Sequence, residues 1–141
     1  DMYLYAKRYV SEYREEDKPI KEKLAEIVGH DVSEVKSEAA YWRKANQIHA
    51  WFVDNIQDGE DDCKDYWVGR NRLQELIDIC KRVKADPELA EELLAPRGGF
   101  FFGSTIVDEI YLDDIDRTIN QLEAALSKYD NNWEFYYGSS W

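Results

Sequence analysis

One stretch near the end of the chain, residues 108–129, limits the possible folds more than any other. Its apolar residues recur at intervals of three and four, at Tyr111, Leu112, Ile115, Ile119, Leu122, Leu126 and Tyr129. That spacing is typical of an α-helix that buries one face. The opposite face is acidic and carries Glu109, Asp113, Asp116 and Glu123. A helix of this kind needs a surface elsewhere in the chain on which to pack.

Period-two patterns at the two ends of the chain predict that surface. In residues 3–13 tyrosines occupy one parity and aliphatic residues the other, and WEFYY at 133–137 has the composition of a strand. We expect the two strands to pair in a small antiparallel sheet, with the FFF segment at 100–102 as a candidate third strand. Three or four helices would cover one face of this sheet. The predicted class is α+β, and the absence of βαβ alternation excludes a Rossmann-type fold.

The stretch 41–55, YWRKANQIHAWFVDN, gathers basic, aromatic and histidine side chains. At about 100° per residue it projects as a helix with one apolar face: Trp42, Ala45, His49, Phe52, Val53 and Ile56. Asn46 and His49 fall inside the apolar arc, and Trp51 falls on the opposite, wet side. We therefore expect a main helix over this stretch with an exposed Trp51. Because tryptophan is frequent in interface hot spots, that exposure would favour a partner or a homo-oligomer.

Other segments carry weaker signals. A short amphipathic helix is expected after Pro19, and further helices over 71–85 and 86–94. In the 71–85 segment Cys80 shares the apolar face with Leu73, Leu76, Ile77 and Val83, which predicts a small core residue and not a nucleophile. The segment 32–40 either extends the main helix towards the N-terminus or forms a short strand that leads into it.

The net charge narrows the choice of partners. The 141 residues include 30 acidic and 18 basic ones, a formal charge of −12. Such a field opposes direct nucleic-acid binding, because phosphate contacts require Lys and Arg. It favours basic partners, although the same charge would also simply keep a small protein in solution.

Composition and cysteine usage indicate the class of protein. Hydrophobic content of 44% and aromatic content of 14% predict a real core, and the length fits a single compact domain over residues 2–141. The two cysteines form no CxxC pattern, and no apolar run approaches 18 residues. We therefore expect no zinc site, no membrane span and a reducing, cytoplasmic location.

Four motifs give the chain a resemblance to a group of small proteins, with no established activity, encoded by tailed phages and prophages. They are YWRKAN-x-IH-x-WFV at 41–53, DDC at 61–63, FFFGS at 100–104 and YY-x-SSW at 136–141. The resemblance covers most of the chain and implies a phage-encoded viral protein that acts in the bacterial host cytoplasm. Small acidic proteins of that origin often antagonise host defence, some by mimicking the charge of DNA.

The leading hypothesis is therefore an anti-defence inhibitor that acts by binding. An acidic surface, with Asp61, Asp62, Asp113 and Asp116 as candidates, would dock on a basic host protein of the nucleic-acid-binding kind. The alternative is that these carboxylates form an ordinary solvent-exposed surface and bind no partner.

A second hypothesis is a pocket that sequesters a nucleotide-like small molecule, with aromatic rings stacking a base and basic groups holding phosphate. Its candidates are Trp42, Arg43, Lys44, Asn46, His49, Trp51, Phe102, Ser104, Tyr136 and Trp141. The alternative, that Asn46 and His49 are core polar residues with satisfied hydrogen bonds, is favoured over a binding role. A third hypothesis, an enzyme, would combine His49 with Asp62 and Cys63, but the crowded acidic loop 58–65 disfavours a reactive thiolate. We predict no catalytic residue, cofactor or metal.

Overall fold

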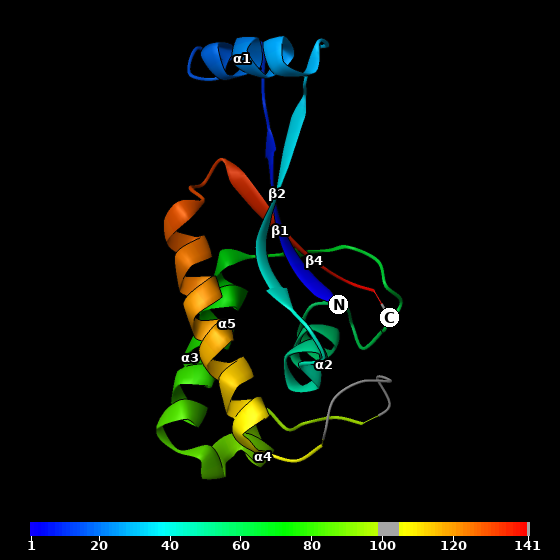
Figure 1. Cartoon of the computed structure of the whole chain (residues 1–141), viewed down its shortest axis with the longest axis vertical. Helices are drawn as coiled ribbons and strands as arrows, with labels where there is room; N and C mark the ends of the chain where they lie inside the picture. The colour runs from blue at the N-terminus through cyan, green and yellow to red at the C-terminus, as the bar shows by residue number, and fades with distance from the viewer. Residues whose placement is uncertain (99–104, 141) are drawn as a thin grey trace.

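The computed structural model describes residues 1–98 and 105–140, and their arrangement is α+β, as the patterns predict (Figure 1). The strands are β1 (Met2–Tyr9), β2 (Glu34–Trp42), β3 (Tyr66–Val68) and β4 (Trp133–Ser139). The helices are α1 (Lys18–Val28), α2 (Asn46–Asn55), α3 (Arg70–Ala85), α4 (Ala90–Leu93) and α5 (Glu109–Lys128), with a 3-10 turn at Pro87–Leu89 before α4. None of the helices in these two ranges is long and apolar enough to cross a membrane.

The four strands form one antiparallel sheet in the order β2-β1-β4-β3. The first and last strands lie side by side, as predicted, with Leu4 opposite Tyr137 and Ala6 opposite Phe135. These four side chains are buried, whereas Tyr3, Tyr5, Lys7, Glu134 and Tyr136, which alternate with them, are not. One face of the sheet is therefore in the core and the other is directed towards solvent.

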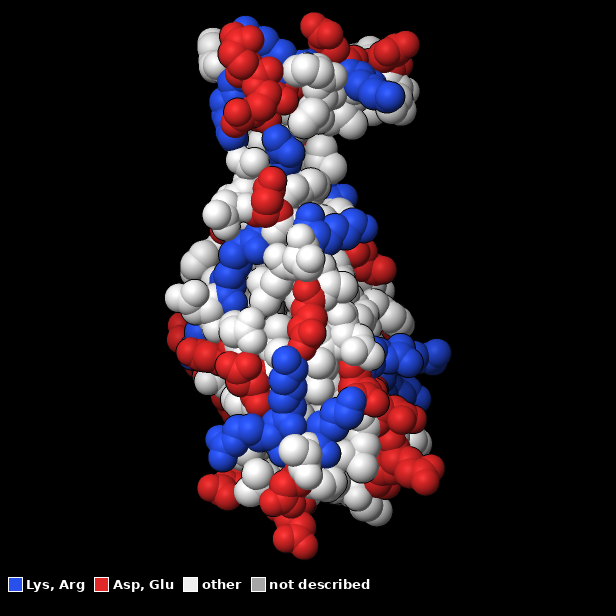
Figure 2. All heavy atoms as spheres, turned by 90° about the vertical axis from the view of Figure 1, so that its left-hand side faces the viewer, with Lys and Arg blue, Asp and Glu red and all other residues white. Residues whose placement is uncertain are grey.

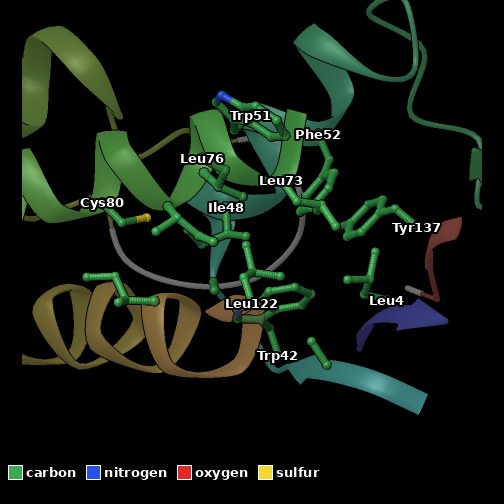
Figure 3. Close-up of a cluster of buried hydrophobic side chains, with 14 of the residues drawn as sticks. Leu4, Trp42, Ile48, Trp51, Phe52, Leu73, Leu76, Cys80, Leu122 and Tyr137 are labelled. Carbon is green, nitrogen blue, oxygen red and sulfur yellow. The ribbon is translucent and has the colours of Figure 1, made fainter. Parts of the chain in front are cut away.

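Helices α3 and α5 run beside each other and enclose the core with the sheet and α2 (Figure 1). Asp108 begins α5 by accepting a hydrogen bond from the backbone N–H of Tyr111 at 3.0 Å. The buried cluster brings Leu4 and Tyr137 from the sheet together with Phe52 of α2 and Leu122 of α5 (Figure 3). Cys80 lies in this cluster and is fully buried, which confirms its predicted core role.

Beyond Tyr9 and Glu34, where the pairing of β1 and β2 ends, the chain carries α1 away from the body of the molecule (Figure 1). Helix α1, which was predicted after Pro19, ends at Gly29, whose φ of 84° lies in the left-handed region that glycine adopts freely. Its attachment depends on Asp17, a fully buried carboxylate that accepts hydrogen bonds from Arg8 at 2.6 Å and from the backbone of Ser11 at 3.0 Å.

The prediction of a helix beginning near Tyr41 was wrong, because residues 41–42 complete β2 and α2 begins only at Asn46. Helix α5 accounts for the difference. Gln121 both accepts a hydrogen bond from the backbone N–H of Tyr41 and donates one to its carbonyl, at 2.9 and 3.0 Å. Trp42 donates its indole N–H to Thr118 at 2.9 Å. These contacts, with the pairing to β1, stabilise the strand. The strand alternative for 32–40 is confirmed over 34–40.

The expectation that Trp51 is exposed was also wrong, since only 5% of its surface is accessible. Every residue of α2 from Asn46 to Val53 is buried, so this part of the helix has no solvent-exposed face on which Trp51 could lie. Its ring meets Phe52 edge-on at 5.1 Å between centroids. Trp51 therefore gives no support for a partner or homo-oligomer interface. The predicted FFF strand lies outside the described residues.

Candidate functional site

The residues predicted to line one pocket lie in three different environments. Trp42, Asn46, His49 and Trp51 are buried, whereas Arg43 and Lys44 are exposed in the turn between β2 and α2. Tyr136 lies on the outer face of the sheet. Phe102, Ser104 and Trp141 are outside the described residues. Within the parts that the structure describes, the predicted set does not form one pocket.

His49 is the centre of a buried polar network. Its Nδ1 lies 2.7 Å from the hydroxyl oxygen of Tyr137, and its Nε2 lies 2.8 Å from Oδ1 of Asp61. A carboxylate can only accept a hydrogen bond, so Nε2 carries the proton and Nδ1 accepts the hydroxyl proton of Tyr137. The Tyr137 ring is stacked on Phe52 with centroids 3.8 Å apart. This network joins α2, the acidic loop and β4.

Burial determines the charge state of this network. It lowers the pKa of His49 below its ordinary value, although the neighbouring Asp61 carboxylate acts in the opposite direction. It also holds the pKa of Tyr137 well above its ordinary value. Both groups are therefore neutral near pH 7. His49 is thus a neutral, buried imidazole whose two ring nitrogens are both hydrogen-bonded. These features fit the role of a core polar residue better than the role of a catalytic residue.

The residues of the enzyme hypothesis are not assembled. Asp62 accepts a hydrogen bond from the hydroxyl of Tyr66 at 2.6 Å, and Cys63 is exposed while His49 is fully buried. Asn46 also has a core role, because its side-chain oxygen accepts the backbone N–H of Arg97 at 3.1 Å. Asn46 and His49 thus anchor loops from inside the core.

The acidic face of α5 is balanced by basic residues of α3. Lys84 pairs with Asp116 at 2.6 Å and Lys81 pairs with Glu123 at 2.7 Å. Figure 2 shows Lys and Arg side chains standing among the acidic ones on the side of the molecule that these two helices form. Exposed pairs of this kind contribute about 0–1 kcal/mol each. This side of the molecule therefore does not form the continuous acidic surface that was expected around Asp113 and Asp116.

The outer face of the sheet carries an aromatic surface that we call the tyrosine face: Tyr3, Tyr5, Tyr41, Tyr136 and Trp67. The register explains it. Tyr5 lies opposite Tyr136, which in turn lies opposite Trp67, and Tyr3 lies opposite Tyr41. Residues paired in this way share a face of the sheet. The rings of Tyr3 and Tyr5 are stacked at 5.5 Å, and Trp67 is 59% exposed.

Charged groups of both signs surround the tyrosine face. The ammonium of Lys36 lies 3.8 Å from the ring centroid of Tyr5, and that of Lys7 lies 4.4 Å from the centroid of Tyr136. The pKa of Tyr5 is raised, chiefly by burial and then by the nearby Tyr3, Asp65 and Glu38. The carboxylates of Asp65 and Glu38 therefore lie close enough to the Tyr5 ring to act on its charge. A Cβ on Gly138 would sit 2.2 Å from Oδ1 of Asp65, so the glycine lets this acid lie against the sheet.

The tyrosine parity of residues 3–9 was the only sequence signal for this surface. It indicated an aromatic side of the first strand but not which residues would join it. Tyr41 and Trp67 become part of the same surface only through the strand order, which the sequence did not predict. Tyr136 was chosen for a different pocket.

Predicted ligand residues border two separate cavities: Trp51 lines one of about 270 Å³, and Arg43 and Lys44 line another of about 170 Å³. In the smaller cavity Arg43 and Lys44 line one side, and the first turns of α5 line the other. Both volumes are smaller than the roughly 300–1,000 Å³ of pockets for drug-sized ligands. A nucleotide-sized molecule does not fit inside the cavity that Arg43 and Lys44 line.

Comparison of the chain with protein-family models, curated proteins and solved structures found no match.

Proposed function

We propose that the chain is a non-enzymatic binding protein that docks a basic partner protein on its tyrosine face. The observation that carries the proposal is the alignment of Tyr5, Tyr136 and Trp67 across three strands, beside carboxylates of neighbouring strands. Tyrosine and tryptophan supply large contact areas at a small cost in side-chain entropy, which is why they dominate binding hot spots.

The two lysines on this surface support a cationic partner. Lys36 and Lys7 already lie over tyrosine rings, so the surface accommodates cations in the free chain. An arginine of a partner would compete for the same ring faces, and such a contact contributes about 0.5–2 kcal/mol, more as water is excluded. Arginine also pairs with carboxylates through two hydrogen bonds.

The charge balance favours a protein over a nucleic acid. Single-stranded nucleic acids also stack on aromatic platforms, but they require a positively charged groove. Here Lys7 and Lys36 are set against the carboxylates of Glu38, Glu134 and Asp65, and the whole chain carries −12. The long-range field therefore attracts a basic protein and repels a phosphate backbone.

The finer part of the proposal concerns the setting. In the phage context that the sequence motifs imply, the partner is a basic bacterial defence factor, and occupation of its nucleic-acid-binding surface by this chain would inhibit it. Because Asp116 and Glu123 of α5 pair with lysines of α3, we propose the sheet as the docking surface and not the acidic face of α5.

Affinity capture with matched variants tests the proposal. The double variant Tyr5→Ser/Tyr136→Ser removes the centre of the tyrosine face, and Tyr13→Ser removes a tyrosine that is 87% exposed outside it. The wild type and Tyr13→Ser should retain the same basic protein from a bacterial lysate, confirmed with purified components, and the double variant should lose it. Equal retention by all three, or retention of an acidic protein, would contradict the proposal.

A further inference from the structure

We infer a second binding site, separate from the tyrosine face, for a small aliphatic zwitterion of amino-acid size. The site is the 170 Å³ cavity between the turn that joins β2 to α2 and the N-terminal part of α5. Its wall combines both signs of charge with apolar side chains: Arg43, Lys44, Gln47, Ile106, Asp108, Ile110, Tyr111 and Asp114.

The positive side of the cavity consists of two adjacent cations. Arg43 and Lys44 are both exposed, and neither side chain forms a hydrogen bond or ion pair with any residue that the structure describes. Lys44 has a φ of 58°, a backbone conformation that is uncommon for a residue with a Cβ. Such strain at a ligand-facing turn is typical of functional positions. Two adjacent cations of this kind are suited to a carboxylate.

The negative side consists of Asp108 and Asp114. One carboxylate oxygen of Asp108 is already used to cap α5 through Tyr111. Asp114 is half-buried, and its carboxylate has no hydrogen-bond or ion-pair partner among residues 1–98 and 105–140. Burial raises the pKa of Asp114 to about 6, against the weaker opposing effect of Arg117. A carboxylate kept at a cavity wall without a partner is a feature of binding sites, because a ligand cation then supplies the missing contact.

The two charged sides do not neutralise each other, since no ion pair within 4.0 Å joins Arg43 or Lys44 to Asp114. A simple anion would meet the carboxylates, and a simple cation would meet Arg43 and Lys44. A zwitterion satisfies both sides at once, with its carboxylate towards the turn and its ammonium towards Asp114.

The remaining wall selects an apolar substituent. Ile106 and Ile110 are 67% and 71% exposed, although large aliphatic side chains are normally buried. They border the same cavity as the buried Tyr111. The substituent of an aliphatic α-amino acid would cover part of their surface, and the cavity volume limits the ligand to about that size.

A ligand series tests the inference through amide chemical shifts of the 15N-labelled chain. L-leucine should shift the amides of Lys44, Ile110 and Asp114. N-acetyl-L-leucine, which lacks the ammonium, and L-leucinamide, which lacks the carboxylate, should bind at least about tenfold more weakly. No shifts with L-leucine up to about 10 mM, or equal affinity for all three compounds, would overturn the inference.

Variants separate this site from the tyrosine face. Asp114→Asn and Arg43→Gln should each weaken L-leucine binding about tenfold, with native circular dichroism as the check on folding. Tyr5→Ser/Tyr136→Ser should bind L-leucine as the wild type does. Unchanged L-leucine affinity in Asp114→Asn and Arg43→Gln would place the ligand elsewhere and contradict the site. Because the two sets of variants differ, failure of this site leaves the proposed docking surface to be judged by its own test.

Discussion

Replacement of Asp114 by asparagine should make the protein more stable, in contrast to most substitutions of a partly buried polar residue. Asparagine keeps the shape of the side chain and removes only the charge. That charge is unfavourable in the folded state because burial raises the pKa of Asp114 from 3.8 to about 6. The folded chain therefore holds the carboxylate at neutral pH at a cost in free energy.

The size of the effect follows from that shift. A change of roughly two pH units corresponds to ~3 kcal/mol at 1.36 kcal/mol per unit. Because the side chain is only half-buried, solvent screening reduces this value, and we expect a gain of ~1 kcal/mol in the free energy of unfolding at pH 7. For a chain of this size that corresponds to ~3 °C in Tm.

The pH dependence identifies the cause. A raised folded-state pKa means that the contribution of Asp114 to stability is fully present below 3.8 and is lost as the pH rises through about 6. The advantage of Asp114→Asn should therefore be largest above pH 6 and should disappear towards pH 4. Urea denaturation across this range measures it. The control is Asp113→Asn, which removes the same charge from an exposed neighbour. Equal stabilisation by both variants, or a gain that does not depend on pH, would refute the role of burial.

Three further outcomes are expected. Tyr137→Phe removes the hydroxyl that donates to Nδ1 of His49 and should lower the free energy of unfolding by ~1–3 kcal/mol in urea denaturation; no loss would contradict the buried network. The stability that depends on neutral His49 should be fully present above pH 6.5 and decline as the pH falls through its lowered folded-state pKa, so the advantage of the wild type over His49→Gln should shrink progressively below pH 6.5. Asp116→Asn should change stability by less than ~1 kcal/mol, because its pair with Lys84 is exposed; a larger loss would show a stronger pair.

The sequence predicted those elements whose periodicity runs without interruption. Helices α3 and α5 and strand β4 match their predicted segments closely, and Cys80 lies in the core as its place on the α3 face required. Each of these elements buries one face and exposes another, and this asymmetry is what a periodic pattern records.

The errors around residues 41–55 have a physical cause. Trp42 and His49 have a spacing that fits one helical face, yet Trp42 belongs to a strand that Gln121 and Thr118 of α5 hold in place. Local periodicity contains no information about such distant contacts. Trp51 was wrongly predicted to be exposed because residues 46–53 of α2 are all buried. A helical projection cannot separate a buried face from an exposed one in such a helix.

The partners of His49 were beyond sequence reasoning for a related reason. Asp61 and Tyr137 are 12 and 88 positions away along the chain. The polar position inside an apolar arc correctly indicated that His49 needs partners. Only the fold supplies their identity, and with it the distinction between a core network and an active site.

The most direct test of the proposed docking surface is a chemical-shift map of the 15N-labelled chain titrated with a ten-residue arginine peptide, with a glutamate peptide of equal length as control. We expect the arginine peptide to shift amides of Tyr3, Tyr5 and Tyr136 at physiological salt, and the glutamate peptide to shift none of them. Shifts centred on Asp116, or no shifts with the arginine peptide, would contradict a sheet face that docks a basic partner.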